Sequence, residues 1–431
     1  MKINRYEGLE RMFVIVMIIF VLGIGTAAGE TSEDDTYIIR DVFELQAIND
    51  DIKGNYILAN DIDASVTRDW NQGEGFLPIG LDDPFTGEFD GNGHVVKGLY
   101  ISRGNVSNAA LFGSVGEGGT IRDIGLVNSV VVGGNNVGGL IGFNGGSHVS
   151  NSYFSGEVMG RDNVGGLIGY NYRGDVYHSF STGEVKGNGT VGGMIGLNTG
   201  TTHRTYFSGE VIGDGNRVGG LMGFNSGMIS ESYTSVAVKG RTYVGGFVGY
   251  NCFALISGSY STGFVNGSST VGGLMGWNDG NVQNSYSLAD VNGDRNVGGL
   301  VGVNAIGVLE NSYAAGKVNG GENIGGLLGL NRDDGIVDSC FWDVDVSGQS
   351  VSDGGIGLTT GKMMESDTYI DAGWDLEDTW TLIEDETYPF LNWKDETEAE
   401  LRRDFTYIWL SIIIVLVVVL ASIFLKTGRD H

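Results

Sequence analysis

The chain has 431 residues, enough for a large core, and its 75 glycines stand against only three prolines. A collagen triple helix needs abundant proline and a strict three-residue period, so this composition excludes it. The 25 basic and 53 acidic residues give a net charge of −28, which argues against nucleic acid or anionic lipid as a partner.

The N-terminus has the features of an export signal. Three basic residues precede an apolar run at residues 12–24, and small residues follow it as far as Ala28. A positive start, a short apolar run and a small-residue cleavage site are typical of secretory signal peptides. We therefore predict that residues 1–28 are a signal peptide and that the rest of the chain is exported.

Residues 29–136 are predicted to be an N-terminal cap followed by degenerate coils. Apolar side chains within residues 41–52 recur near helical spacing, which predicts a short amphipathic helix. Such a helix would cover the first coil, because an uncovered strand edge is an aggregation hazard. Shortened versions of the later repeat occupy residues 110–134.

An eight-residue phrase then returns eight times at a nearly fixed interval. The first copy, VGGLIGFN, starts at Val137 and the last, IGGLLGLN, starts at Ile324, with steps of 26 or 27 residues. A fixed period of this length indicates stacked units that share one continuous core. We assign the eight repeats to residues 137–346.

Each unit contains three short apolar stretches bounded by turn residues, as at residues 164–169, 176–180 and 184–185. Stretches this short predict strands, and the density of glycine excludes an all-helical solenoid. The predicted fold is therefore all-β, a parallel β-helix with one coil of about 27 residues per repeat.

Stacking would place equivalent residues of successive coils above one another. The phrase ends in asparagine every time, which predicts a ladder of side-chain amides like those of cross-β stacks: Asn144, Asn171, Asn198, Asn225, Asn251, Asn278, Asn304 and Asn331. A hydroxyl column follows it, at Ser152 and its equivalents.

An aromatic column lies directly after the hydroxyl column. Its members are Tyr153, Phe180, Tyr206, Tyr233, Tyr260, Tyr286 and Tyr313, with Cys340 in the last unit. Sugars stack on aromatic rings, so the column could form a carbohydrate-binding face. We favour an internal stack that fills one corner of the coil, because every coil keeps the position.

The C-terminal region is predicted to close the stack and reach a membrane. Residues 347–400 form a capping and acidic segment, rich in tryptophan and carboxylates. Residues 405–425 carry no charge and are long enough for a single membrane-spanning helix. With an export signal in front, this predicts repeats outside the cell and a cytoplasmic tail at residues 426–431.

The chain also contains two cysteines and three glycosylation sequons. Cys252 and Cys340 fall in different columns three coils apart, an offset of about 14 Å at the spacing of neighbouring strands, so we predict no disulfide. The sequons at Asn105, Asn188 and Asn266 permit glycosylation of an exported chain.

The phrase VGGLIGFN, followed by N-S-Y and then G-E-V, resembles the GLUG-motif family of surface proteins, unit by unit over residues 137–344. The resemblance extends to the flanks, with NYILANDIDAS at residues 55–65 and YPFLNW at residues 388–393. It implies a right-handed parallel β-helix on the outside of a prokaryotic cell, and favours an archaeal one. It implies no defined reaction.

Some members of this family are attached to metallopeptidases, whose zinc site needs H-E-x-x-H. None of the five histidines of this chain is followed by glutamate. His148, His178 and His203 occur in successive units, but at different offsets from the phrase. We therefore predict neither a metal site nor a cofactor.

A polysaccharide lyase or glycoside hydrolase is the competing hypothesis, because such enzymes also use β-helices. Its chemistry needs carboxyls about 5–9.5 Å apart. The candidates lie in the leading segment, in NDID and EFDGNGH: Asp61, Asp63, Glu88 and Asp90.

We predict a membrane-anchored, non-enzymatic surface protein that acts in adhesion, recognition or as an envelope scaffold. Its expected partners are components of the cell envelope or of another cell's surface, carbohydrate among them. The loops at residues 251–257 and 304–310 vary most between coils and are the expected contact points.

Overall fold

The computed structural model describes residues 36–332 and 334–394. The predicted signal peptide and the predicted span at residues 405–425 lie outside these ranges and stay predictions. Within the described ranges, none of the helices has the length and apolar character of a membrane span.

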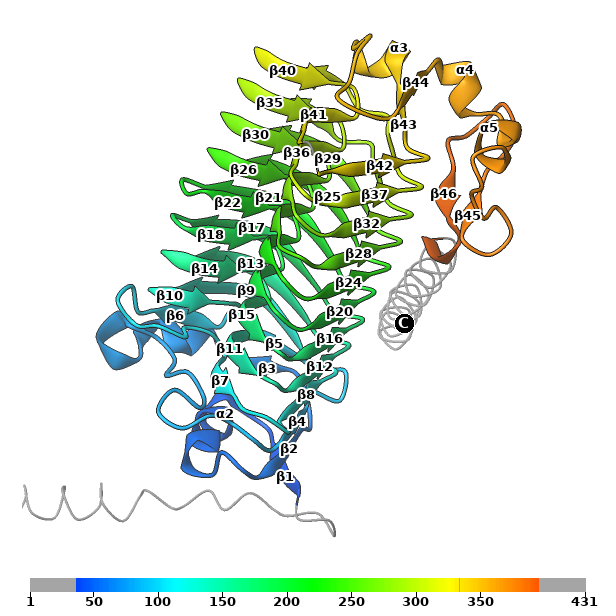
Figure 1. Ribbon diagram of the computed structural model, residues 1–431. Coiled ribbons are helices and arrows are strands. Elements are labelled where there is room, and N and C mark those ends of the chain that lie inside the picture. Colours follow the sequence, from blue (N-terminus) through cyan, green and yellow to red (C-terminus); the bar gives the residue numbers. More distant parts are fainter. Residues whose placement is uncertain (1–35, 333, 395–431) are drawn as a thin grey trace, which may run out of the picture.

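Equivalent strands of successive coils pair in parallel, which builds four long sheets (Figure 1). Residue pairs in the regular coils are offset by 26 or 27 positions, as in Asn144 with Asn171 and Val218 with Val244. The predicted all-β parallel solenoid with coils of about 27 residues is confirmed. Its right-handed sense stays a prediction.

Each regular coil passes through the four sheets in one order, and in that order we name them D, C, A and B. Most coils therefore have four strands where the sequence predicted three, and two coils have five because their sheet B strand is divided. The apolar stretch at residues 164–169 is divided, because β14 ends at Gly165 and β15 begins at Ile168. The chain turns a corner between them.

Sheet D has eight strands: β10 (Asn135–Val137), β14 (Asp162–Gly165), β18 (Thr190–Gly192), β22 (Arg217–Gly219), β26 (Thr242–Gly245), β30 (Ser269–Gly272), β35 (Arg295–Gly298) and β40 (Glu322–Gly325). Sheet C has nine: β7 (Phe112–Val115), β11 (Ile141–Gly145), β15 (Ile168–Tyr172), β19 (Ile195–Asn198), β23 (Met222–Asn225), β27 (Val248–Asn251), β31 (Met275–Asn278), β36 (Val301–Asn304) and β41 (Leu328–Asn331).

Sheet A has twelve strands: β1 (Thr36–Ile39), β2 (Asn55–Leu58), β4 (Glu88–Asp90), β8 (Thr120–Arg122), β12 (His148–Ser150), β16 (Asp175–Tyr177), β20 (Thr201–His203), β24 (Met228–Ser230), β28 (Leu255–Ser257), β32 (Asn281–Gln283), β37 (Val308–Glu310) and β42 (Ile336–Asp338).

Sheet B has fifteen strands: β3 (Ile62–Asp63), β5 (Val95–Lys97), β6 (Tyr100–Ser102), β9 (Gly125–Val132), β13 (Tyr153–Met159), β17 (Phe180–Gly187), β21 (Tyr206–Gly213), β25 (Tyr233–Lys239), β29 (Tyr260–Asn266), β33 (Tyr286–Ser287), β34 (Asp290–Asn292), β38 (Tyr313–Ala314), β39 (Val318–Asn319), β43 (Phe341–Asp343) and β44 (Ile356–Leu358).

The glycines of the phrase sit where the backbones of stacked coils approach most closely. A Cβ on Gly166 would lie 2.3 Å from the carbonyl oxygen of Gly193 in the next coil, and one on Gly165 would lie 2.6 Å from the backbone nitrogen of Gly196 in that coil and 2.1 Å from the carbonyl oxygen of Ile168 in its own. Such distances leave no room for a side chain. The valine before them and the leucine and isoleucine after them point inward, so Val164, Leu167 and Ile168 are all fully buried.

The asparagines that end each phrase form a continuous amide ladder inside the solenoid. The Nδ2 of each donates to the Oδ1 of the next over 2.8–3.0 Å, from Asn144 up to Asn331. The seven from Asn144 to Asn304 are fully buried. An amide can both donate and accept, so each rung is satisfied by its own neighbours.

A short helix closes the N-terminal end. Helix α2 (Val42–Ala47) begins at Asp41, whose side chain accepts hydrogen bonds from the backbone N–H of Phe43 and Glu44. The helix continues into the 3-10 turn η1 (Ile48–Asp50). Val42, Leu45 and Ile48 are buried in the same apolar core as the coils. Two further 3-10 turns follow, η2 (Ser65–Asp69) and η3 (Asn71–Gly73).

Two parts of the C-terminal region contact different surfaces of the solenoid. Residues 351–353 cover the open edge of the last coil, where Ser352 Oγ accepts from the backbone N–H of Leu328 over 2.8 Å. Residues 359–394, here named the clasp, instead fold back along the side of the solenoid (Figure 1). Around and within it lie α3 (Val344–Ser347), α4 (Thr360–Met363), α5 (Ser366–Ile370), β45 (Trp380–Thr381) and β46 (Phe390–Leu391).

The amide ladder predicts a specific weak point. In Asn198→Ala, the buried amides of Asn171 and Asn225 would each lose a partner, and an unpaired buried polar group costs about 1–3 kcal/mol. We expect the free energy of unfolding, measured by urea denaturation, to fall by about 3 kcal/mol. The matched control is Asn281→Ala, at an exposed position, which should change it by less than about 0.5 kcal/mol. Equal effects of the two variants would contradict a stabilising ladder.

Candidate functional site

The four candidate catalytic carboxylates lie in two groups at the N-terminal end of the stack. Asp61 accepts from Lys97 Nζ at 2.8 Å and lies 3.3 Å from His94 Nδ1. Lys97 lowers the pKa of Asp61, and a backbone hydrogen bond from Ser65 lowers that of Asp63. A general acid in glycoside hydrolysis needs a raised pKa, so neither residue is suited to that role.

Glu88 and Asp90 are brought together on β4, but around a cation. Arg122 of the neighbouring strand β8 bonds Glu88 at 2.9 Å, Asp90 at 2.6 Å and Asp123 at 2.9 Å. Asp90 also accepts from the backbone N–H of Asn92. This arrangement orders the turn between β4 and β5 and leaves neither carboxylate free of a partner.

Two of the three coil histidines are neighbours, because the rings of His178 and His203 meet edge to face with centroids 6.0 Å apart. His148 lies 3.2 Å from Asp175, and His203 bonds Ser230 at 2.9 Å. Burial lowers the pKa of His203. Over residues 36–332 and 334–394, no three side chains of the kinds that bind metals gather at one point.

The aromatic column lies on the outer face of sheet B, which corrects the expected internal stack. Side chains alternate along β13, so Tyr153 points outward while Phe154, 1% exposed, joins the core. The interior corner is occupied instead by the hydroxyl column, as at Ser152. Neighbouring rings stack with centroids 4.5–5.2 Å apart and planes within 12°. Rings stacked in this way present edges to solvent, and a sugar ring needs faces.

The last rung of this column is Phe341 and not Cys340. The loop before β42 is one residue longer than its equivalents, so Tyr313 pairs with Phe341. Cys340 therefore takes the inward position and is part of the main apolar core, where it is 1% exposed. Both cysteines are free thiols.

The clasp covers the upper part of the aromatic column. Tyr286 and Tyr313 are each 1% exposed beneath it, whereas the rungs from Tyr153 to Tyr233 are partly exposed. Tyr313 donates to the carbonyl of Pro389 at 2.8 Å, and fully buried Trp380 packs over both rings. The clasp residues and the upper rungs form an apolar cluster separate from the main core.

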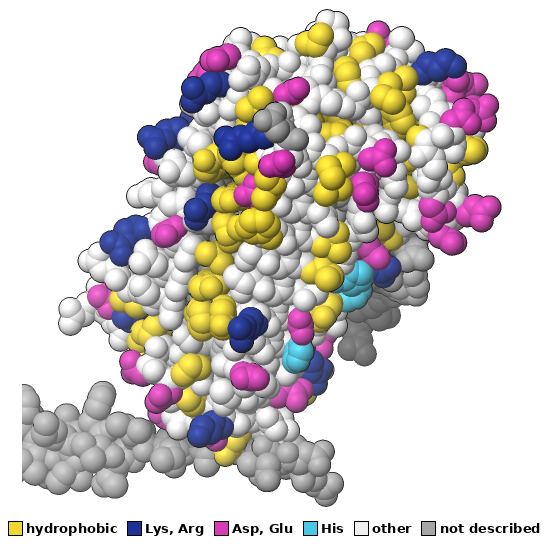
Figure 2. All heavy atoms as spheres, in the orientation of Figure 1, with side chains coloured by type: hydrophobic (Ala, Val, Ile, Leu, Met, Phe, Trp, Pro, Cys, Tyr) yellow, Lys and Arg dark blue, Asp and Glu magenta, His cyan; other side chains and the backbone are white. Residues whose placement is uncertain are grey.

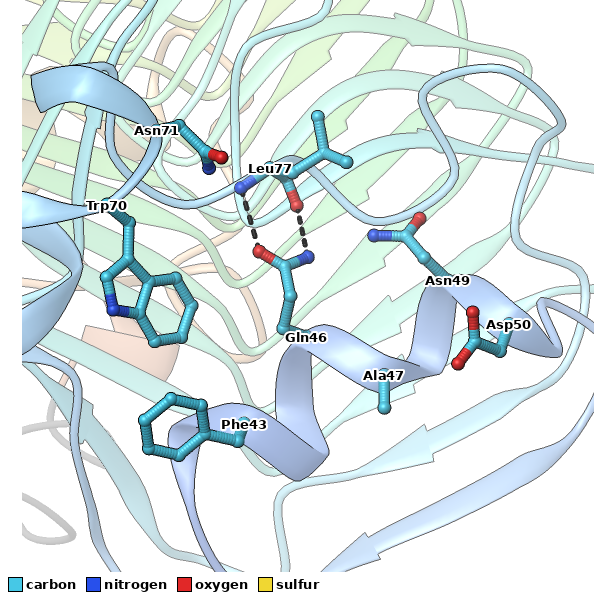
Figure 3. Close-up of a pocket in the computed structure, with 8 residues that line it drawn as sticks. All are labelled: Phe43, Gln46, Ala47, Asn49, Asp50, Trp70, Asn71 and Leu77. Carbon is cyan, nitrogen blue, oxygen red and sulfur yellow. Dashed lines mark hydrogen bonds between the residues drawn. The ribbon is translucent and has the colours of Figure 1, made fainter. Parts of the chain in front are cut away.

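A pocket of about 550 Å³ lies in the cap, between α2 and the loop after η3 (Figure 3). Phe43 and Trp70 line one side, and the Gln46 amide bonds both backbone groups of Leu77. Asn49 accepts from the backbone N–H of Gly80, while its buried Nδ2 has no partner among the described residues. The remaining lining residues are Ala47, Asp50 and Asn71.

This pocket suits binding better than catalysis. Aromatic walls, amides and an unsatisfied donor are typical of small polar ligand sites. Asp50 is the one ionisable side chain that lines it, so an acid–base pair is absent from the described lining. Sequence reasoning missed the pocket because its two walls are 31 residues apart in the chain.

The sequons differ in accessibility. Asn105 and Asn188 are exposed, while Asn266 is partly buried and accepts from Asn292 over 3.2 Å. The backbone N–H of Thr190, within the second sequon, bonds Asp162. Glycosylation itself stays a prediction at all three.

A second aromatic column, on the outer face of sheet C, also escaped the sequence analysis. It occupies the position of each phrase that varies most, directly before the final asparagine, and is aromatic in five of the eight coils. Its side chains alternate with the buried residues of the same strands, as in Tyr170 between Ile168 and Asn171. The variation of this position between coils was the signal in the sequence that could have indicated an exposed column.

Burial makes a testable distinction between the two thiols. It raises the pKa of Cys340 to about 12, and only the thiolate reacts with alkylating agents. We expect iodoacetamide at pH 8 to label the partly exposed Cys252 in the folded protein and Cys340 only after denaturation. Peptide mass spectrometry would show this, with Cys252→Ser as the control. Labelling of folded Cys252→Ser would contradict the assigned burial.

The clasp should depend on its buried tryptophan. Trp380→Ala removes a fully buried indole, a change that typically costs about 3–5 kcal/mol. We expect faster proteolysis within residues 359–394 and faster hydrogen exchange in β33 and β38. Ile383→Ala, at a 48% exposed clasp position, should change neither. If the two variants behave alike, the clasp is not held by this cluster.

Known proteins resemble parts of this chain. The model of the GLUG motif matches residues 133–159, 160–186 and 293–319. Halomucin of Haloquadratum walsbyi is 38% identical over 145 residues, 31% of this chain. A Gly-rich membrane protein of Evansella cellulosilytica is 35% identical over 141 residues, 30% of this chain. The matches span only 2% and 16% of these two relatives.

Two solved structures also resemble the fold. An immunoglobulin A1 protease-like protein from Bacteroides ovatus aligns over 85% of this chain and 94% of its own, with 20% identity and a TM-score of 0.38. An IgA1 protease aligns over 80% of this chain and 25% of its own, with 16% identity and a TM-score of 0.33. These similarities are too low to bear on activity. The family model does identify three repeats of this chain, at residues 133–159, 160–186 and 293–319, as GLUG motifs.

Proposed function

We propose that the protein is a non-enzymatic surface scaffold that recognises components of a cell envelope or of another cell. It would be exported by the signal at residues 1–28 and anchored in the cytoplasmic membrane by the helix predicted at residues 405–425. The partial similarity to a membrane protein supports this location.

One observation carries the non-enzymatic part of the proposal. Each of the four candidate carboxylates is engaged with a cation or with a backbone N–H. A hydrolase needs one protonated and one free carboxyl, and a lyase needs a free base. The solenoid meanwhile provides a long, rigid surface of paired strands, which suits recognition.

Two exposed side chains support the predicted contact loops. Phe253 is 74% exposed and Ile306 is 45% exposed, at equivalent corners of two coils. They lie two coils apart, with Gly280 at the equivalent corner between them, so they mark two separate exposed apolar points on one edge and not a continuous patch.

The experiment incubates the full-length chain, in mild detergent, with whole cells and with envelope and plant polysaccharides. Retention and released fragments are scored in the same tubes. We expect retention without fragments, unchanged in Asp61→Asn and in Glu88→Gln/Asp90→Asn. Asp175→Asn, in the regular coils, is the matched control for loss of a partly paired carboxylate.

Released fragments that disappear in the carboxylate variants would overturn the proposal in favour of a polysaccharide-active enzyme. The location is tested separately, by protease treatment of intact cells that make the protein. Degradation of the repeats is expected, and full protection would contradict an exterior position.

A further inference from the structure

The sheet C column consists of eight equivalent residues in register on the outer face of that sheet: Phe143, Tyr170, Leu197, Phe224, Tyr250, Trp277, Val303 and Leu330. All are partly exposed except Val303, which is 1% exposed. Figure 2 shows the resulting band of hydrophobic side chains along this face, with basic side chains at intervals beside it. The clasp packs on sheet B and leaves the band uncovered.

The rings of this column are arranged differently from those on sheet B. Phe143 with Tyr170, Phe224 with Tyr250 and Tyr250 with Trp277 meet at 79°, 83° and 71°. In an edge-to-face pair, the ring that contributes its edge keeps both faces clear of its partner. Edge-to-face packing within the column therefore leaves ring faces for other contacts, which the parallel stack on sheet B does not. Guanidinium groups lie over one face of Phe224 and one face of Trp277, so the ligand would pack on what remains.

The upper part of the column is held rigidly by one carboxylate. Asp279 accepts from the hydroxyl of Tyr250 at 2.6 Å and from the indole N–H of Trp277 at 2.8 Å. Tyr243 packs against both rings from the neighbouring corner. A surface fixed before binding loses less entropy when a ligand arrives.

Three arginines lie over rings on this face. Arg217 is 5.0 Å from the ring centre of Phe224, Arg332 is 4.6 Å from that of Trp277, and Arg173 is 5.1 Å from that of Tyr172. None of them forms an ion pair with a carboxylate of the described residues, although the chain has twice as many acidic as basic residues. Arg122 and Arg204, elsewhere on the solenoid, do form such pairs.

A guanidinium stacked on a ring still presents its N–H edge outward. That edge matches a carboxylate in a bidentate geometry. The face therefore combines two features. The column side chains recur with the coil spacing of about 4.8 Å, and three arginines at irregular positions beside them supply donors that form no ion pair with a carboxylate of the described residues.

We propose that the sheet C column binds an acidic polysaccharide, with pyranose rings packed on the aromatic faces and uronate carboxylates bonded by Arg217, Arg332 and Arg173. The inference rests on the proposed function as a recognition scaffold and names its ligand class. A repeating polymer fits a repeating column. An extended peptide could not add as a strand here, because the inner strands of sheet C are already paired on both sides.

The net charge of −28 opposes the approach of a polyanion. Salt screens that repulsion beyond about 8 Å at physiological ionic strength, whereas a contact pair on the partly buried Arg217 is screened less; Arg173 and Arg332 are exposed. Binding is therefore expected at physiological salt and is measured there.

The experiment uses the full-length chain in mild detergent and measures its binding to polygalacturonate by biolayer interferometry. Two matched probes accompany it: fully methyl-esterified polygalacturonate, which lacks the charges, and poly-glutamate, which lacks the sugar. We expect binding to polygalacturonate, at least tenfold weaker binding to the ester, and none to poly-glutamate.

Single-residue variants test whether the sheet C column is the surface that binds the polysaccharide. Trp277→Ala and Arg217→Gln should each weaken binding about tenfold, which corresponds to about 1.4 kcal/mol. Tyr206→Ala, on the sheet B column, and Arg295→Gln, an exposed arginine of sheet D, should leave it unchanged. Circular dichroism checks the folding of Trp277→Ala, and Arg217→Gln tests the proposal even if that variant misfolds.

Equal binding of poly-glutamate would overturn the proposal in favour of an acidic polypeptide, and equal binding of the ester would overturn the role of the arginines. Absence of binding, or binding that Arg217→Gln leaves unchanged, would also overturn it. None of these outcomes produces fragments, so each is distinguishable from failure of the non-enzymatic function.

Discussion

In-register stacking is the constraint on which the rest of this structure depends. Every residue of a regular coil has its own equivalent above and below, at the spacing of neighbouring strands. A column of identical residues is therefore stable only if the side chain can pack against, or hydrogen-bond with, a copy of itself. Asparagine meets this condition because its amide both donates and accepts. Glycine meets it where a carbonyl oxygen of the adjacent coil comes so close that a Cβ would not fit. A buried column of like charges would fail this condition.

The sequence was sufficient to predict the solenoid, because period and glycine placement depend directly on stacking. It was insufficient for the corners. The run VGGLIG reads as one strand, yet the chain turns within it, since paired glycines tolerate a turn and an extended strand equally well. The outward position of Tyr153 was missed for a related reason. Its neighbours Ser152 and Phe154 both point inward, and alternation cannot be read across a corner whose location is unknown.

The candidate site was less predictable than the fold. The carboxylates of the leading segment were identifiable as residues, but not their partners. Arg122 reaches Glu88 from a strand 34 residues later, and Lys97 reaches Asp61 over 36 residues. The arginines beside the sheet C column sit at different offsets in their coils, Arg217 on a sheet D strand and Arg173 and Arg332 just after sheet C strands, so no periodic signal marks them. Only the fold brings each of them over an aromatic ring.

The clasp also determines how the molecule responds to force. It runs from the last coil back to the middle of the stack, where Trp393 donates to the carbonyl of Gly258 at 2.9 Å and contacts Tyr233 and Tyr260. A pull on the C-terminal end of the described chain therefore acts on the flank of the solenoid rather than on its tip. It would peel the aromatic contacts apart one after another, starting at Trp393, before tension reached any coil. Under such a load the contacts of the clasp would therefore carry the force before the hydrogen bonds of the stacked sheets do.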